Sequence, residues 1–168
     1  MIQAPVVLAS PELYIAGLRE RVDVRTAGPR IGSLWRKLTM AGEIEGQVPN
    51  GLSYGASIYA SQTEFDYLAG VPLKNGFTAL PEGYTLLEVP AQTWLVFEHR
   101  GHMGSMPGTI HNIWAEWFPS QTEWRPAPQS TVSPMLLEVY DEERFDPKQG
   151  SGIVELWVAA DKAATAAP

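Results

Sequence analysis

Apolar residues recur at helical spacing in two segments of the chain, residues 31–38 and 110–117. Within each segment they occupy positions i, i+3, i+4 and i+7, which places them on one face of a helix. The second pattern follows the first after 79 residues. The positions are Ile31, Leu34, Trp35 and Leu38 in the first segment, and Ile110, Ile113, Trp114 and Trp117 in the second. This repetition predicts two equivalent helices in a duplicated scaffold.

Runs of apolar and alternating residues predict strands on both sides of each helix. The expected strands are 6–22 with a break at Ser10-Pro11, then 54–59 and 65–71, and in the second half 84–90, 93–99, 135–140 and 153–158. Each half therefore has the order strand, helix, strand, strand. Glycines and a proline between residues 74 and 83 mark the seam between the halves.

The order of these elements predicts an α+β fold. We expect two tandem strand-helix-strand-strand modules, residues 5–76 and 77–160, related by pseudo-twofold symmetry within a single domain of residues 1–168. The sheet should be largely antiparallel, with the two helices on one face and a central cleft. The small, biased segment 161–168 is expected to be a frayed tail. If the halves superpose, Trp35 should align with Trp114, and Tyr59 with Tyr140.

Composition narrows the classes of partner. The chain has 168 residues, 45% of them hydrophobic, and a net charge of −7. An acidic surface repels phosphates, so we expect no direct contact with nucleic acid. No apolar run is long enough to span a membrane, and no signal peptide is apparent. The absence of cysteine excludes disulfides and thiolate metal sites, and it suits a cytoplasmic protein.

Four stretches of the chain resemble the GyrI-like effector-binding family. They are residues 89–101 (VPAQTWLVFEHRG), 113–119 (IWAEWFP), 137–141 (LEVYD) followed by 145–147 (FDP), and 153–158 (IVELWV). The family is named for a gyrase-inhibitory protein, and its domain also forms the drug-sensing half of several AraC-type and MerR-type regulators. The likeness spans residues 5 to 160 and implies two modules around a central cleft.

The resemblance also implies a function. Family members bind lipophilic, often cationic, compounds in the cleft, using a glutamate at the position of Glu138. We therefore expect binding of an aromatic or cationic small molecule. Fewer than ten residues precede the first expected strand, so we expect no helix-turn-helix, unlike the regulators. Some stand-alone members are cofactor-free hydrolases that open strained cyclopropane rings of DNA-alkylating natural products, which is the alternative function here.

The candidate site centres on Glu138, which alternation places on one strand face with Leu136 and Tyr140. Aromatic side chains bind flat molecules and cations through their ring faces. The expected ligand-binding residues are Glu138, Trp117, Tyr54, Tyr59, Tyr140, Trp35 and Trp114. If the protein is an enzyme, Glu138 would act as general base, with Tyr54 or Tyr140 stabilising the oxyanion.

Other chemistry has weaker support in the sequence. His99 and His102 lack a third donor nearby, so we expect no metal site, and no motif indicates a cofactor. A third function remains open, in which the chain is an interaction module for a protein partner such as gyrase. The sequence leaves the oligomeric state undetermined.

Overall fold

The structure is a computed structural model that describes residues 2–164. Its first half contains β1 (Val6–Ser10), β2 (Leu13–Asp23), α1 (Ala27–Ala41), β3 (Leu52–Tyr59) and β4 (Glu64–Pro72). Its second half contains β5 (Thr85–Val89), β6 (Gln92–His102), α2 (Met106–Asn112), β7 (Trp124–Pro126), β8 (Leu136–Asp146) and β9 (Ser151–Lys162). A short 3₁₀ turn precedes α2. A π-helical turn (Ile113–Trp117) and a second 3₁₀ turn (Phe118–Ser120) continue it.

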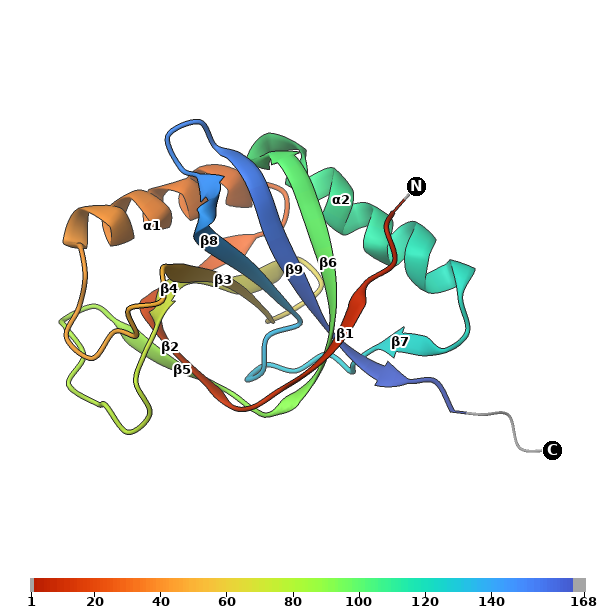
Figure 1. The fold of residues 1–168 in the computed structure, drawn as a ribbon, viewed down its shortest axis with the longest axis horizontal. Coiled ribbons are helices and arrows are strands. Elements are labelled where there is room, and N and C mark those ends of the chain that lie inside the picture. Colours follow the sequence, from red (N-terminus) through yellow and green to blue (C-terminus); the bar gives the residue numbers. More distant parts are fainter. Residues whose placement is uncertain (1, 165–168) are drawn as a thin grey trace.

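The strands form one curled antiparallel sheet, and both helices pack on the same side of it (Figure 1). The strand order is β1-β6-β9-β8-β3-β4-β2-β5, with β7 added beside β9. β3 and β8 meet in the middle, so the two halves join through their central strands. The predicted α+β fold with an antiparallel sheet and two helices on one face is confirmed.

The pseudo-twofold symmetry follows directly from the element bounds. Adding 79 to the bounds of β1 and β2 gives those of β5 and β6, and α1 maps onto the helical segment from Met106 to Ser120. Trp35 and Trp114 therefore occupy equivalent positions, as predicted. The edge strands are exchanged, because β1 pairs with β6 and β5 pairs with β2. This exchange ties the halves together at both edges of the sheet.

The equivalence of the later strands differs from the prediction. Gly17 and Val96 are equivalent, so the residues that pair with them, Gly70 and Trp157, are equivalent too. By the same step across the next strand, Tyr54 is equivalent to Leu137. Gly55 is therefore equivalent to Glu138, and these two residues also lie opposite each other in the sheet. Tyr140 corresponds to Ser57, so its predicted alignment with Tyr59 is wrong. The cause is the longer connection before β8, which contains β7.

Buried side chains fill both faces of the sheet. On the face that carries the helices, here called the helix face, α1 packs over Tyr67 and Ala69 while Ile113 and Phe118 pack over Leu95 and Phe97. The opposite face, here called the far face, has its own apolar cluster that includes Ile15, Tyr54, Ile58, Trp94 and Leu137. Alternation along each strand decides which face a side chain reaches.

The C-terminal end of the described chain is more regular than expected. β9 continues to Lys162, where Lys162 pairs with Trp124 of β7. The predicted tail began at residue 161, so its first two residues belong to a strand, while residues 165–168 lie outside the described residues. Among residues 2–164, neither helix has the length and apolar character that crossing a bilayer requires.

Candidate functional site

A buried carboxylate lies at the centre of the sheet. Glu138 is on β8, between Gly55 of β3 and Leu156 of β9, and its side chain points to the helix face. Only 6% of Glu138 is exposed. Charged residues are almost never fully buried without a partner, because removing a charge from water is costly. The burial therefore requires either neutralisation of the carboxyl or donors that stabilise its charge.

Two phenols supply such donors. The Tyr140 hydroxyl donates to Oε1 of Glu138 over 2.7 Å, and the Tyr67 hydroxyl donates to the same oxygen over 3.3 Å. The indole Nε1 of Trp35 in turn donates to the Tyr67 hydroxyl over 2.9 Å. This chain of hydrogen bonds links helix α1 to the carboxylate through strand β4.

Burial dominates the electrostatics of the group. Desolvation raises the pKa of Glu138 to about 7, although hydrogen bonds from Tyr140 and Tyr67 oppose the increase. Burial and the neighbouring Glu138 raise the pKa of both tyrosines well above its usual value, so both phenols remain protonated donors. Near neutral pH the carboxyl is thus balanced between its neutral and ionised forms, and a nearby cation would shift it to the ionised form.

Aromatic rings surround this carboxylate on the helix face. The Trp35 ring meets Tyr140 edge-on, with centroids 5.0 Å apart, and Phe145 packs on the other side of Tyr140 at 5.1 Å. Trp35 is only partly buried. It comes from α1, and it also contacts the apolar cluster under the second helix. The space above Tyr140 is thus occupied by side chains from both halves.

The second helical segment contributes further rings. Trp117 packs edge-on against Phe97 and Phe118, each at 5.1 Å, and Trp114 contacts Phe118 at 6.2 Å. Both tryptophans lie in the π-helical turn Ile113–Trp117, and both are partly buried. A π turn inside a helix is rare and is frequent at functional sites. It interrupts the second helix at the segment that carries these two rings.

Two predicted site residues lie elsewhere. Tyr54 is paired with Val139 and points to the far face, because it is one residue from Gly55 and side chains alternate along a strand. It cannot contact Glu138 through the sheet, which corrects its predicted role in lining the cleft or stabilising an oxyanion there. Tyr59 lies at the end of β3, four residues beyond Gly55, and pairs with Phe65.

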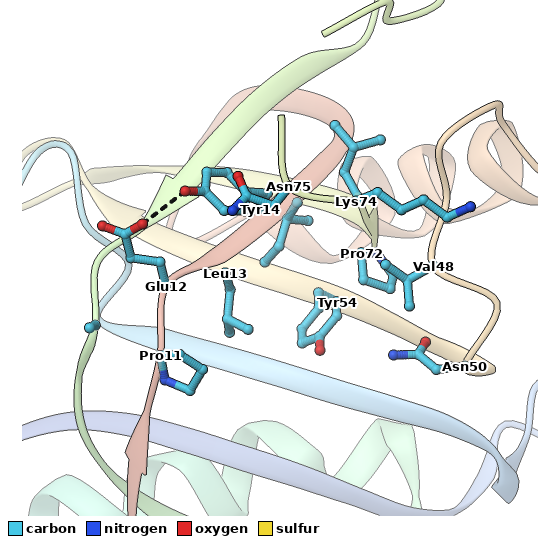
Figure 2. A pocket seen from close by; sticks show the side chains of 13 residues that line it. Pro11, Glu12, Leu13, Tyr14, Val48, Asn50, Tyr54, Pro72, Lys74 and Asn75 are labelled. Carbon is cyan, nitrogen blue, oxygen red and sulfur yellow. Dashed lines mark hydrogen bonds between the residues drawn. The ribbon is translucent and has the colours of Figure 1, made fainter. Parts of the chain in front are cut away.

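One open surface pocket lies on the far face. It has a volume of about 620 Å³, and Tyr54 lines it together with Pro11, Leu13 and Asn50 (Figure 2). At its rim the Tyr14 hydroxyl donates to Glu12. Glu138 does not line this pocket. The open pocket and the buried carboxylate are therefore at different places. The strongly raised carboxyl pKa is that of Glu138, outside the pocket.

Residues 3–160 match the GyrI-like small molecule binding domain. The chain belongs to this family. Family membership shows a small-molecule binding domain over nearly the whole chain. The structure contains a buried glutamate, Glu138, and aromatic clusters on the helix face of this domain.

Relatives of known sequence or structure agree with this assignment. The transcriptional regulator BrlR of Pseudomonas aeruginosa is 29% identical over 132 residues, which cover 78% of this chain and 46% of BrlR. The chain thus spans about half of that relative. The structure of SAV2435 bound to tetraphenylphosphonium superposes with a TM-score of 0.72 at 16% identity, covering 95% of this chain and 94% of the other. The EcmrR C-terminal domain gives 0.62 at 14% identity, covering 97% and 99%.

Sequence reasoning missed two residues that lie beside Glu138, Tyr67 and Gly55. Tyr67 lies in the predicted strand 65–71, to which the sequence pattern assigns no site residue. Gly55 has no side chain that could take part in chemistry. Alternation along β3 and β4 contained a usable signal, since residues at the register positions beside a buried carboxylate are candidates to stabilise it. That signal requires the strand pairing, which the sequence did not provide.

The histidines form a different arrangement. His99 is 3% exposed, and its ring contacts the Thr109 hydroxyl at 2.8 Å and the His102 carbonyl at 3.0 Å. Its ring nitrogens therefore already have partners. Within residues 2–164, no three His, Asp or Glu side chains gather in a way that could hold a metal ion.

Proposed function

We propose that this domain binds lipophilic aromatic cations on the helix face, with Glu138 as the anion that recognises the positive charge. The proposed ligand-binding residues are Glu138 and Tyr140 on the sheet floor, Trp35 on α1, and Trp114 and Trp117 on the second helical segment. One observation carries the proposal: Glu138 is buried, yet no Lys, Arg or His among residues 2–164 forms an ion pair with it.

Among residues 2–164, no positive charge pairs with the buried carboxylate of Glu138. Desolvation raises the pKa of Glu138 to about 7, so the ionised form is costly in the free protein. A cation placed beside the carboxylate would remove much of that cost, and a neutral molecule would not. Surrounding tryptophan and tyrosine rings attract cations through their faces and exclude water from the pair. Such a site selects for positive charge on a large apolar body.

Similar proteins support this choice of ligand. SAV2435, which shares the fold, was solved with tetraphenylphosphonium, a cation shielded by four phenyl rings. BrlR is a transcriptional regulator, and this chain resembles less than half of it. We infer that this domain acts as a ligand-sensing or ligand-sequestering unit. The proposal for this chain depends on its own buried glutamate, and the likeness only identifies a suitable probe.

Ligand access requires movement of side chains. The Trp35 ring lies against Tyr140, with centroids 5.0 Å apart, so it occupies space beside the carboxylate. Trp35 and the tryptophans of the π-helical turn are partly exposed, and they can swing outward more readily than the buried floor. We expect a bound cation to separate α1 from the second helical segment and to replace these ring contacts.

The test compares ions of opposite charge and matched shape. Tetraphenylphosphonium and tetraphenylborate should be titrated into the protein at pH 8, with binding followed by quenching of tryptophan fluorescence. The wild-type protein should prefer the phosphonium. Glu138→Gln keeps the side-chain shape and removes the charge, so it should weaken phosphonium binding by about 2–5 kcal/mol, the range for losing one member of a buried charge pair. Binding of tetraphenylborate should not weaken.

A matched control separates the local charge from the overall charge of the protein. Glu116→Gln removes an exposed carboxylate from the same helical segment as Trp117 and should leave both titrations unchanged. The proposal fails if the wild-type protein binds both ions equally, or if Glu138→Gln leaves the preference for the phosphonium intact. The hydrolase alternative needs its own substrate: in a separate incubation with a strained cyclopropane compound, ring opening by water would appear in the mass spectrum as a gain of one water.

A further inference from the structure

Gly55 is the pseudosymmetric counterpart of Glu138, and it lies directly opposite that residue in the sheet. A Cβ atom at Gly55 would lie 2.1 Å from the Tyr67 hydroxyl and 3.2 Å from Cδ of Glu138. No real Cβ makes the first of these contacts. The missing side chain at residue 55 therefore leaves the space through which the Tyr67 hydroxyl reaches the carboxylate.

The direction of the hydrogen bonds at Tyr67 is determined by chemistry. An indole N–H can only donate, so the Tyr67 oxygen accepts from Trp35 and directs its single proton to Glu138. Tyr67 is 1% exposed, so water does not compete for this proton. Trp35 thus orients a buried phenol whose only remaining donor is directed at the carboxylate.

We propose that Tyr67, which Gly55 leaves room for and Trp35 orients, stabilises the ionised form of Glu138 alongside Tyr140 and so strengthens the preference of the site for cations. This inference deepens the proposed function and depends on it for the identity of the ligand. Tyr67 is a positioning residue: it holds the ionised carboxylate ready, while Glu138 itself faces the ligand. The link through Trp35 also connects the charge state of the site to the position of helix α1.

The groups that act on Glu138 are few. On β8 the Tyr140 hydroxyl donates to it, and on β4 the Tyr67 hydroxyl donates to it; α1 contributes Trp35, which is not titratable. The groups that shift its pKa within the described chain are these two phenols and burial. Removing one phenol should therefore shift the pKa of the Glu138 carboxyl measurably, because no charged side chain of the described residues contributes to that pKa.

The first test is Tyr67→Phe, which keeps the ring and removes the hydroxyl. Losing a hydrogen bond to the ionised form raises the pKa of a carboxyl by about one unit or more. The titration midpoint of the Glu138 carboxyl, followed by ¹³C NMR in ligand-free protein, should therefore rise by about one unit. A merely structural role for Tyr67 would lower stability and leave that midpoint unchanged.

The same shift should appear in ligand binding. If the midpoint moves from near 7 to near 8, the ionised fraction at pH 7 falls from about one half to about one tenth. Tetraphenylphosphonium affinity at pH 7 should then fall about fivefold and recover to near wild type at pH 9. Tyr14→Phe is the control, since it removes an exposed tyrosine–glutamate hydrogen bond of 2.8 Å at the rim of the pocket that Glu138 does not line.

A double-mutant cycle tests the role of Gly55. Gly55→Ala should push the Tyr67 hydroxyl away and raise the midpoint as Tyr67→Phe does. In the Tyr67→Phe background it should produce no further rise, because the displaced hydroxyl is already absent. Gly28→Ala, where a Cβ meets nothing within 4 Å, controls for the added methyl group. If Gly55→Ala does not fold, the titration of Tyr67→Phe alone decides.

The two readouts separate this inference from the proposed function. A raised carboxyl midpoint in Tyr67→Phe supports control of the charge by Tyr67, even if the wild-type protein binds no phosphonium and the proposed function fails. An unchanged midpoint overturns the inference, whatever the protein binds. A raised midpoint with equal phosphonium affinity at pH 7 and pH 9 overturns the link between this charge and ligand preference.

Discussion

The buried carboxyl should make the stability of this protein depend on pH in an unusual direction. Glu138 has a pKa of about 7 in the folded protein, whereas 4.5 is its ordinary value. The folded state therefore holds its proton more tightly than the unfolded state does. Between these two values the folded protein binds more protons, so stability falls as pH rises through this window.

The size of the effect follows from the shift. One pKa unit corresponds to about 1.4 kcal/mol, so a shift of this size implies a loss of roughly 3 kcal/mol between pH 4 and pH 8. For a chain of this length, each kcal/mol moves the melting temperature by about 2–4 °C. Glu138→Gln has no proton to lose, so it should remove this loss and be the more stable protein at pH 8.

The assay is urea unfolding of both proteins at pH 5 and pH 8, followed by tryptophan fluorescence. The variant should exceed wild type by less than about 1 kcal/mol at pH 5, where the carboxyl of the unfolded chain is already largely ionised, and by about 3 kcal/mol at pH 8. The difference between the two proteins, and not the curve of either alone, isolates the carboxyl. Parallel curves, or a variant that is less stable at pH 8, would refute the reasoning.

Two glycines provide further tests of the fold. Gly17→Ala should destabilise the protein by more than about 2 kcal/mol, because its Cβ would lie 2.1 Å from the Ala69 carbonyl oxygen in the neighbouring strand, and a packed core resists such overpacking. A urea midpoint within error of wild type would contradict that close strand approach. Gly32→Ala, in the interior of α1 with its nearest neighbour 3.6 Å away on a flexible arginine, should instead stabilise by about 0.5–1 kcal/mol, because alanine favours the helix. A loss of thermal stability there would mean that α1 needs the glycine for packing.

The local pattern of apolar and polar residues was enough to predict most of the helices and strands. The helical spacing around Trp35 and Trp114 and the alternating strand around Glu138 are properties of short segments, and the structure contains these elements where the pattern placed them. The duplication could be recognised because a constant interval of 79 residues separates β1, β2 and α1 from their counterparts in the second half. The family resemblance drew attention to Glu138, and the structure buries its side chain.

The pairing of distant strands was beyond the reach of local pattern. Which face Tyr54 reaches, and that Tyr59 is not the counterpart of Tyr140, depend on register, which the longer connection before β8 shifts. A slip of one residue reverses every side chain. Tyr67 approaches Glu138 across 71 positions of sequence, through the space left by Gly55. The sequence alone determined which segments are helical or extended, because those properties depend on neighbours along the chain. Only the tertiary structure decided which phenols hold the Glu138 carboxylate, because hydrogen bonds form between atoms that folding brings together.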